Sequence, residues 1–138
     1  MSSLDTLIKL YRWQLDEQRR RVAEFERLAE KLRLQLRRLD EEETNEQQVA
    51  TASHDASYAY GGYARSLIDR RDKLTKSVRD TEQRIVEARA ALADAYAEVK
   101  RYEIAAANRL LAKHRGLERL RQKELDEVAI GGFRRKDK

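Results

Sequence analysis

The sequence predicts an all-α fold, a long antiparallel coiled-coil hairpin of two helices whose second helix is the longer. The chain has 138 residues, of which 40% are charged and none is proline. Because proline breaks helix interiors, its absence favours long uninterrupted helices. A two-helix seam needs only about two apolar residues in seven, which so charged a composition can supply. We therefore expect one coiled-coil domain over residues 1–138, with helices at about 3–50 and 63–130.

Apolar residues recur at alternating steps of three and four along the first helix, which we expect Ser3 to cap. The first ladder is Leu4, Ile8, Tyr11, Leu15, Gln18, Val22, Phe25, Ala29, Leu32, Leu36 and Leu39. Only Gln18 is polar, and such a pattern over about five heptads is typical of a coiled coil. Gln18 either fixes the register of the seam or is tolerated there, and we favour the second.

The segment TASHDASYAYGG, residues 51–62, interrupts the apolar spacing, and we expect it to form the tip of the hairpin. It combines small polar residues, which favour caps and turns, with the adjacent glycines Gly61 and Gly62. Each glycine in a helix interior costs about 1 kcal/mol relative to alanine. This is therefore where reversing the chain costs least.

The second helix carries a longer ladder than the first. It runs through Tyr60, Ala64, Leu67, Arg71, Leu74, Val78, Thr81, Ile85, Ala88, Leu92, Ala95, Val99, Tyr102 and Ala106. We expect the helix to end near Ile130, with Gly131 and Gly132 as its stop and residues 131–138 as a basic tail.

The two arms differ in length, so the second helix should overhang the first. Folding near residue 56 places Leu4 opposite about residue 108, which leaves Leu110 to Val128 projecting by about 30 Å. Residues 109–138 hold ten Lys and Arg against five Asp and Glu. An isolated helix with an apolar stripe is marginal in water, so this basic overhang should bind a second protein.

Trp13 is expected to face away from the seam. If Ile8 and Leu15 occupy position a and Tyr11 position d, Trp13 falls at position f, with Leu10 one turn before it. An exposed tryptophan beside leucine indicates a contact site. The alternative is that Trp13 packs lengthwise along its own helix.

The residue inventory argues against an enzyme. The chain has no cysteine, and its two histidines, His54 and His114, lie far apart on the expected hairpin. We find no phosphate-binding loop, nucleophile motif or metal-ligand spacing, so we expect no catalytic residue, cofactor or metal. The start lacks a secretory apolar run, and no stretch is apolar enough to span a membrane. We therefore expect a soluble intracellular protein.

Three segments follow one another along the chain: DTLIKLYRWQLDEQRRRVA (5–23), YAYGGYARSLIDRRDKL (58–74) and QKELDEVAI (122–130). Together they resemble the flagellar export protein FliJ family, in particular its α-proteobacterial branch. Where that branch is expected to open the second helix with proline, this chain has Gly61 and Gly62.

The resemblance implies a stalk similar to the γ subunit of rotary ATPases, located in the cytoplasm and peripherally at the inner-membrane flagellar export apparatus. It implies that the tip binds the cytoplasmic domain of the export gate and the termini end binds the hexameric export ATPase. Members also escort substrate chaperones. The gate contact would involve Tyr58, Tyr60, Tyr63 and Leu67. The ATPase contact would involve Arg12, Trp13, Leu117, Leu120, Arg134 and Arg135. The alternative for the tyrosines is that they cap the seam.

Two other interpretations stay open. Basic coiled-coil arms can lie along a phosphate backbone, although acids are interleaved along most of this chain, so we do not expect nucleic acid as a partner. The overhangs of two copies could instead pair in a structural homo-oligomer. We expect a monomer in isolation.

Overall fold

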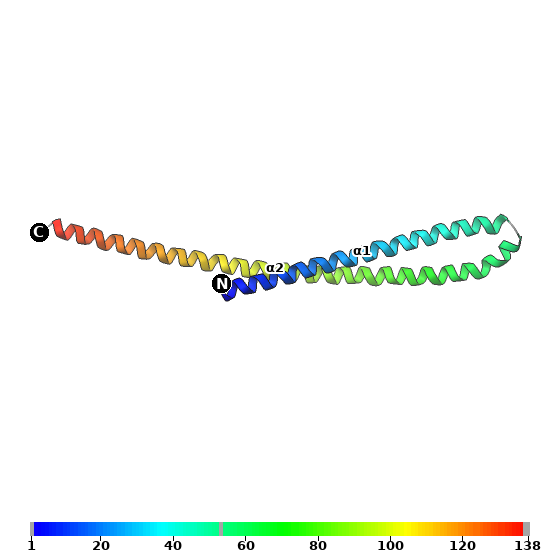
Figure 1. Cartoon of the computed structure of the whole chain (residues 1–138), viewed down its shortest axis with the longest axis horizontal. Coiled ribbons are helices and arrows are strands. Elements are labelled where there is room, and N and C mark those ends of the chain that lie inside the picture. Colours follow the sequence, from blue (N-terminus) through cyan, green and yellow to red (C-terminus); the bar gives the residue numbers. More distant parts are fainter. Residues whose placement is uncertain (1, 53, 137–138) are drawn as a thin grey trace. The chain divides into compact units, whose positions relative to one another are not determined.

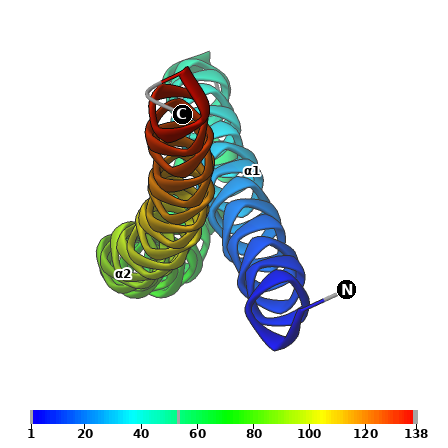
Figure 2. The ribbon, with the colours of Figure 1, turned by 90° about the vertical axis from the view of Figure 1, so that its left-hand side faces the viewer.

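The computed structural model describes the backbone of residues 2–52 and 54–136, and the side chains of residues 2–52 and 60–132. It contains helix α1 (Ser3–Ala52), of 50 residues, and helix α2 (His54–Lys136), of 83 residues (Figure 1). Viewed from its end, the described chain again shows only helical ribbon (Figure 2). The predicted two-helix hairpin with a longer second helix is confirmed.

Helix α1 is capped by Ser2 rather than by Ser3. The backbone N–H of Asp5 donates to Ser2 Oγ at 3.2 Å, and the N–H of Ser2 donates to Asp5 Oδ2 at 3.3 Å. This reciprocal pair is a capping box, in which Asp5 replaces the more usual glutamate. Our assignment of the cap to Ser3 was wrong because Asp5 lies at the third position after Ser2, where the box closes.

The boundaries around the glycine pairs differ from the prediction. Helix α2 begins at His54, so most of residues 51–62 is helical, and it continues past Gly131 and Gly132 to Lys136. No glycine of the described chain has a positive φ. Glycine costs a helix only about 1 kcal/mol, which the flanking helical segments can absorb. The helices are thus separated within the predicted tip at 51–62, although most of that segment is helical, and the predicted end near Ile130 is wrong because α2 continues to Lys136.

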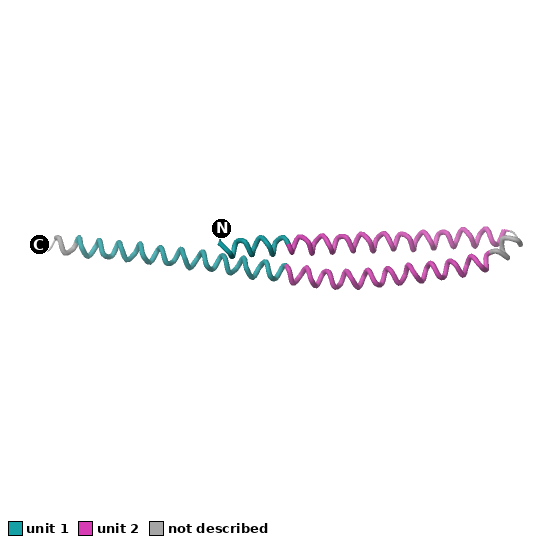
Figure 3. Tube along the Cα trace, turned by 60° about the horizontal axis from the view of Figure 1, so that its bottom comes forward, with its two compact units in different colours: residues 1–13, 96–138 teal, residues 14–95 magenta. Residues whose placement is uncertain are grey.

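Contacts divide the chain into two compact units, coloured separately in Figure 3. Unit 2 is Gln14–Ala95, and unit 1 is Met1–Trp13 with Tyr96–Lys138. In unit 2 the buried residues are Leu15, Val22, Ala29, Leu39, Leu67, Thr81, Ile85 and Ala88. In unit 1 they are Ile8 and Val99. Every one of them is a member of the two predicted ladders. Whether the chain folds as one domain stays a prediction.

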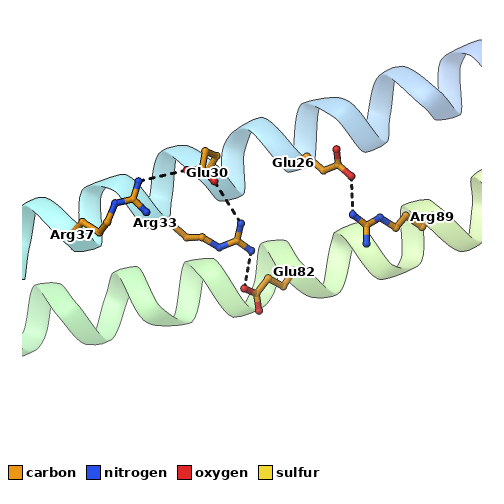
Figure 4. Close-up of polar contacts among 6 residues, drawn as sticks. All are labelled: Glu26, Glu30, Arg33, Arg37, Glu82 and Arg89. Atoms are coloured by element: carbon orange, nitrogen blue, oxygen red, sulfur yellow. Dashed lines mark hydrogen bonds and ion pairs between the residues drawn. The ribbon is translucent and has the colours of Figure 1, made fainter.

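Ion pairs between the helices of unit 2 show its antiparallel register (Figure 4). Arg89 lies 2.9 Å from Glu26, and Arg33 lies 3.0 Å from Glu82. A step of seven residues forward in α1 is thus matched by a step of seven backward in α2, as two heptad helices require. Because the four side chains are between 43% and 62% exposed, these pairs contribute little to stability and mainly favour this register.

Gln18 makes no register-fixing pair. Its Oε1 is buried and accepts no hydrogen bond from the residues that the structure describes. Thr81, the polar residue among the buried ones of the described chain, donates to the carbonyl of Ser77 within its own helix at 2.7 Å. Neither side chain therefore specifies the pairing of α1 with α2, and the interpretation of Gln18 as a tolerated residue is favoured.

Candidate partner-binding surfaces

An aromatic and charged cluster joins the helices of unit 2 near residue 60. The rings of Tyr60 and Tyr63 lie 6.3 Å apart, tilted by 43°. The Tyr63 hydroxyl donates to Glu42 Oε1 at 2.6 Å, and Arg70 donates to the same oxygen at 3.4 Å. The Arg70 guanidinium also lies 6.0 Å from the centre of the Tyr63 ring. Tyr63 is therefore fixed by groups on both helices.

These contacts change the acidity of two groups in the cluster. The hydrogen bond from Tyr63, together with nearby Arg70, lowers the pKa of Glu42. Partial burial, followed by the hydrogen bond to Glu42, raises the pKa of Tyr63. Glu42 is thus held as a carboxylate and Tyr63 as a phenol over the neutral pH range.

A neighbouring cluster explains why an arginine occupies the second ladder. Arg71 forms ion pairs with both Asp40 and Glu43 of α1. Arg70 and Arg71 together therefore engage three carboxylates of the acidic segment that begins at Asp40. The periodicity placed Arg71 on the second ladder without a reason for its charge, and it did not identify Glu42 or Arg70. The run of acids at residues 40–43 was the available signal.

The predicted gate-binding residues differ in accessibility. Tyr60 and Tyr63 are half-buried, whereas the side chain of Leu67 is only 3% exposed and belongs to the seam. Tyr58 lies outside the residues whose side chains are described. Of this set, the structure brings together Tyr60 and Tyr63, and Leu67 can contribute only by supporting the helix beneath them.

In unit 1, an aromatic stack and a charged group join the start of α1 to α2. The rings of Tyr11 and Tyr102 stack with centroids 4.7 Å apart and planes at 14°. Arg12 donates to Glu103 Oε1 at 3.2 Å, and Lys100 lies 3.4 Å from Glu103 Oε2. Both cations lower the pKa of Glu103, and the hydrogen bond from Arg12 is the largest single cause. Arg12, expected at the ATPase contact, thus already has a carboxylate within the chain.

Trp13 lies outside the seam, as its heptad position predicts. It is 62% exposed, and Leu10 is 48% exposed. Lengthwise packing along α1 would cover most of the indole, so the exposure favours the alternative in which Trp13 forms a contact surface. The two residues define a small apolar patch on α1 of unit 1, which we call the Trp13 patch.

The end of α2 in unit 1 has no partner from α1. The pairing of Arg12 with Glu103 places Ser3 across from about residue 112, so residues 112–136 extend past the start of α1 over about 37 Å. All residues from 107 to 130 are exposed, including Leu117 at 58% and Leu120 at 59%. The predicted overhang is therefore confirmed, and it is longer than expected. We call residues 112–136 the overhang.

Positive charge is concentrated at the base of the overhang. Residues 109–123 contain six Lys and Arg and a single acid, Glu118. Glu118 pairs with His114 at 3.0 Å, and none of the six cations has a carboxylate partner within the described chain. Arg134 and Arg135 lie outside the residues whose side chains are described. The accessible cations and leucines together suit an acidic protein surface with apolar recesses.

Other kinds of site find no support among the described residues. No group of three His, Cys, Asp or Glu side chains is placed to hold a metal ion there. No helix in the described ranges is long and apolar enough to cross a membrane. The surfaces left to consider are the Tyr60–Tyr63 cluster, the Trp13 patch and the overhang.

Comparison with known proteins assigns the family. The family model described as "FliJ: Flagellar FliJ protein" matches residues 1–138, the whole chain. A search of curated proteins and a search of solved structures each returned no match. The family is a non-catalytic component of flagellar protein export, which confirms the expectation that the chain is not an enzyme. The chain belongs to the flagellar FliJ protein family.

Proposed function

We propose that the protein is a stalk-like adaptor of the flagellar export apparatus that binds the hexameric export ATPase and the export gate, and that escorts substrate chaperones. Its place would be the cytoplasm, peripherally at the inner-membrane export apparatus. The assignment to the α-proteobacterial branch stays a prediction. The ATPase contact would use the overhang and the Trp13 patch, and the gate contact would use the Tyr60–Tyr63 cluster.

One observation carries the ATPase contact: the overhang is a helix that nothing else in the described chain covers. Residues 112–130 are all exposed, so this part of α2 lacks the tertiary packing that supplies most helical stability in proteins. Leu117 and Leu120 offer apolar area, and the six cations at 109–123 offer charge. A partner with acidic and apolar groups would stabilise this helix. Binding would act by favouring one set of subunit conformations in the hexamer, a population shift rather than chemistry.

The gate contact rests on a different cluster. Tyr60 and Tyr63 are partly accessible, and Glu42 and Arg70 hold Tyr63 in place. Such a fixed aromatic group loses little side-chain entropy on binding, which favours a contact there. The competing role, in which both tyrosines only close the seam, predicts that their loss lowers stability without changing gate binding.

The test is ATP hydrolysis by the cognate export ATPase with and without the protein. We expect stimulation by the full chain and none by a chain ending at Leu111, which keeps every residue of α2 that faces α1. The full-length variant Leu117→Glu/Leu120→Glu should fail in the same way. Its matched control is Val49→Glu, at a site that is 56% exposed in unit 2. Equal stimulation by all four proteins would overturn the assignment of the contact to the overhang.

Two alternative functions are separated by simple measurements. The six cations at 109–123 favour nucleic-acid binding as the second candidate, and that function requires retention with a steep dependence on salt. A homo-oligomer through paired overhangs requires a dimer in sedimentation, whereas our proposal requires an extended monomer.

A further inference from the structure

Helix α2 in unit 1 carries a second run of heptad-spaced residues that does not face α1. The run is Ala97, Lys100, Ile104, Ala107 and Leu111, at steps of three, four, three and four. The seam residues of the same segment are Val99, Tyr102 and Ala106. At 100° per residue, the run lies roughly 150° around the helix from them. We call these five residues the outer stripe.

The outer stripe is uncovered. Ile104 is 59% exposed and Leu111 is 52% exposed, and both alanines are exposed as well. Val99, a β-branched residue of similar chemistry on the seam side, is only 3% exposed. The stripe therefore contributes nothing to the packing of α1 on α2. A single exposed aliphatic residue is ordinary, but four apolar residues in five heptad-spaced positions form the face that a second helix covers.

The sizes of the side chains indicate what fits. Ala97 lies about two helical turns before Ile104, and Ala107 lies about one turn after it. Their small side chains leave shallow depressions on the helix surface. A helix laid on this face would come close to α2 at both alanines. Packing there without voids requires large aliphatic side chains from the partner.

The charges near the stripe indicate that the partner carries a carboxylate. Lys100 is the single charged member of the stripe, and its nearest carboxylate, Glu103, is shared with Arg12. Lys100 also lies 5.4 Å from the ring of Tyr96, whose face attracts the ammonium group without supplying a carboxylate. Lys100 and Arg12 thus share one carboxylate, so the charge of Lys100 is only partly neutralised within the chain. A partner would complement it with an aspartate or glutamate.

We propose that the outer stripe is the docking site for an amphipathic helix of another protein, with large aliphatic residues at heptad spacing and an acid opposite Lys100. This goes beyond the proposed function, because none of the five stripe residues belongs to the overhang, the Trp13 patch or the Tyr60–Tyr63 cluster. The interaction has the helix-on-helix form in which apolar anchors recur every three or four residues.

The experiment is site-specific photo-cross-linking in the flagellated cell with full-length protein. A benzophenone amino acid replaces Ile104 in one strain and Ile68 in the control strain. Ile68 is the matched site, since it is also an isoleucine with 59% exposure. We expect a cross-link at position 104 to a helical, acidic, amphipathic segment of another protein, and no such product at position 68. The cross-linked product at position 104 should still form in a protein that also carries Leu117→Glu/Leu120→Glu, which removes the overhang contact.

Binding then tests the chemistry. A synthetic peptide of the cross-linked segment should bind the full chain at least tenfold more weakly after Ile104→Glu, and more weakly after Lys100→Glu. The same peptide with its acid changed to lysine should regain affinity for Lys100→Glu. Ile68→Glu should stay within about twofold of the unaltered protein, as a surface substitution outside the contact does. Cross-linking to a second copy, to lipid or equally at both positions would overturn the proposal, as would no product at position 104.

Discussion

Tyr11 and Tyr102 stack across the two helices of unit 1, with ring centroids 4.7 Å apart. Next to them, Arg12 of α1 reaches Glu103 of α2. Adjacent residues of one helix thus meet adjacent residues of the other, first through rings and then through charges. Trp13 follows directly in the sequence and is exposed. The stack therefore fixes the helical segment that presents the Trp13 patch.

The first prediction concerns this stack. Tyr102→Ala should lower the free energy of unfolding by about 1–3 kcal/mol, since it removes both an aromatic pair and partly buried area. Urea unfolding followed by circular dichroism measures the change. Tyr96→Ala is the control, at a tyrosine that is 49% exposed, and should change stability by less than about 0.5 kcal/mol. Equal losses from the two variants would show that the stack adds nothing specific.

The second prediction concerns Gly61 and Gly62. Both lie inside α2 without a positive φ, and a Cβ added at either would meet no atom within 4 Å. Alanine at each position should therefore stabilise the protein by roughly 0.5–1 kcal/mol, through helix propensity and a less flexible unfolded chain. Thermal unfolding of Gly61→Ala and Gly62→Ala tests this. A loss of stability in either variant would instead support the prediction that Gly61 and Gly62 form a turn.

The glycine pairs also show what the sequence could and could not predict. All nine apolar residues that are buried in the described part of the chain lie on the two predicted ladders, because heptad spacing directly specifies which face of a helix is covered. The break between the helices lies inside the predicted tip, between Ala52 and His54, but Gly61 and Gly62 are helical because helix propensity is only a weak local preference.

A candidate surface could be predicted from the sequence when its cause lies within one helix, and could not when it depends on how the two helices pair. The exposure of Trp13 follows from its heptad position, and the overhang follows from the unequal ladders. The group of Glu42, Tyr63 and Arg70 depends on the register between the helices, which spacing within one helix does not determine. The outer stripe was visible in the spacing, but only the burial of Val99 against the exposure of Ile104 distinguishes it from the seam.

The third prediction is a pH dependence at Glu103. Arg12 and Lys100 hold its pKa below the usual value of about 4.3. Its stabilising contribution is therefore complete above the unfolded-state pKa and is lost as pH falls through the lower folded-state pKa. We expect Glu103→Gln to lower the melting temperature at pH 7, and the difference from the unaltered protein to disappear below the folded-state pKa. Thermal scans between pH 7 and pH 2 measure it.

Glu124→Gln is the control for that titration, since it replaces an exposed carboxylate on the overhang. Its melting temperature should follow that of the unaltered protein at every pH. A difference for Glu103→Gln that stays constant across the range would mean that the residue acts through packing rather than through its charge.

The fourth prediction uses Trp13 as a probe of the proposed ATPase contact. It is the only tryptophan in the chain and is 62% exposed, so its fluorescence should have the long-wavelength emission of a solvated indole. Trp13→Ala should leave helicity almost unchanged, because surface substitutions usually change stability by less than about 0.5 kcal/mol. It should also weaken binding to the export ATPase, since exposed tryptophans often supply a large share of interface energy. A tryptophan-free variant of the ATPase should shift the emission of the unaltered protein to shorter wavelength. A large loss of helicity in Trp13→Ala, or an emission that does not shift while ATP hydrolysis is stimulated, would exclude the Trp13 patch from the contact.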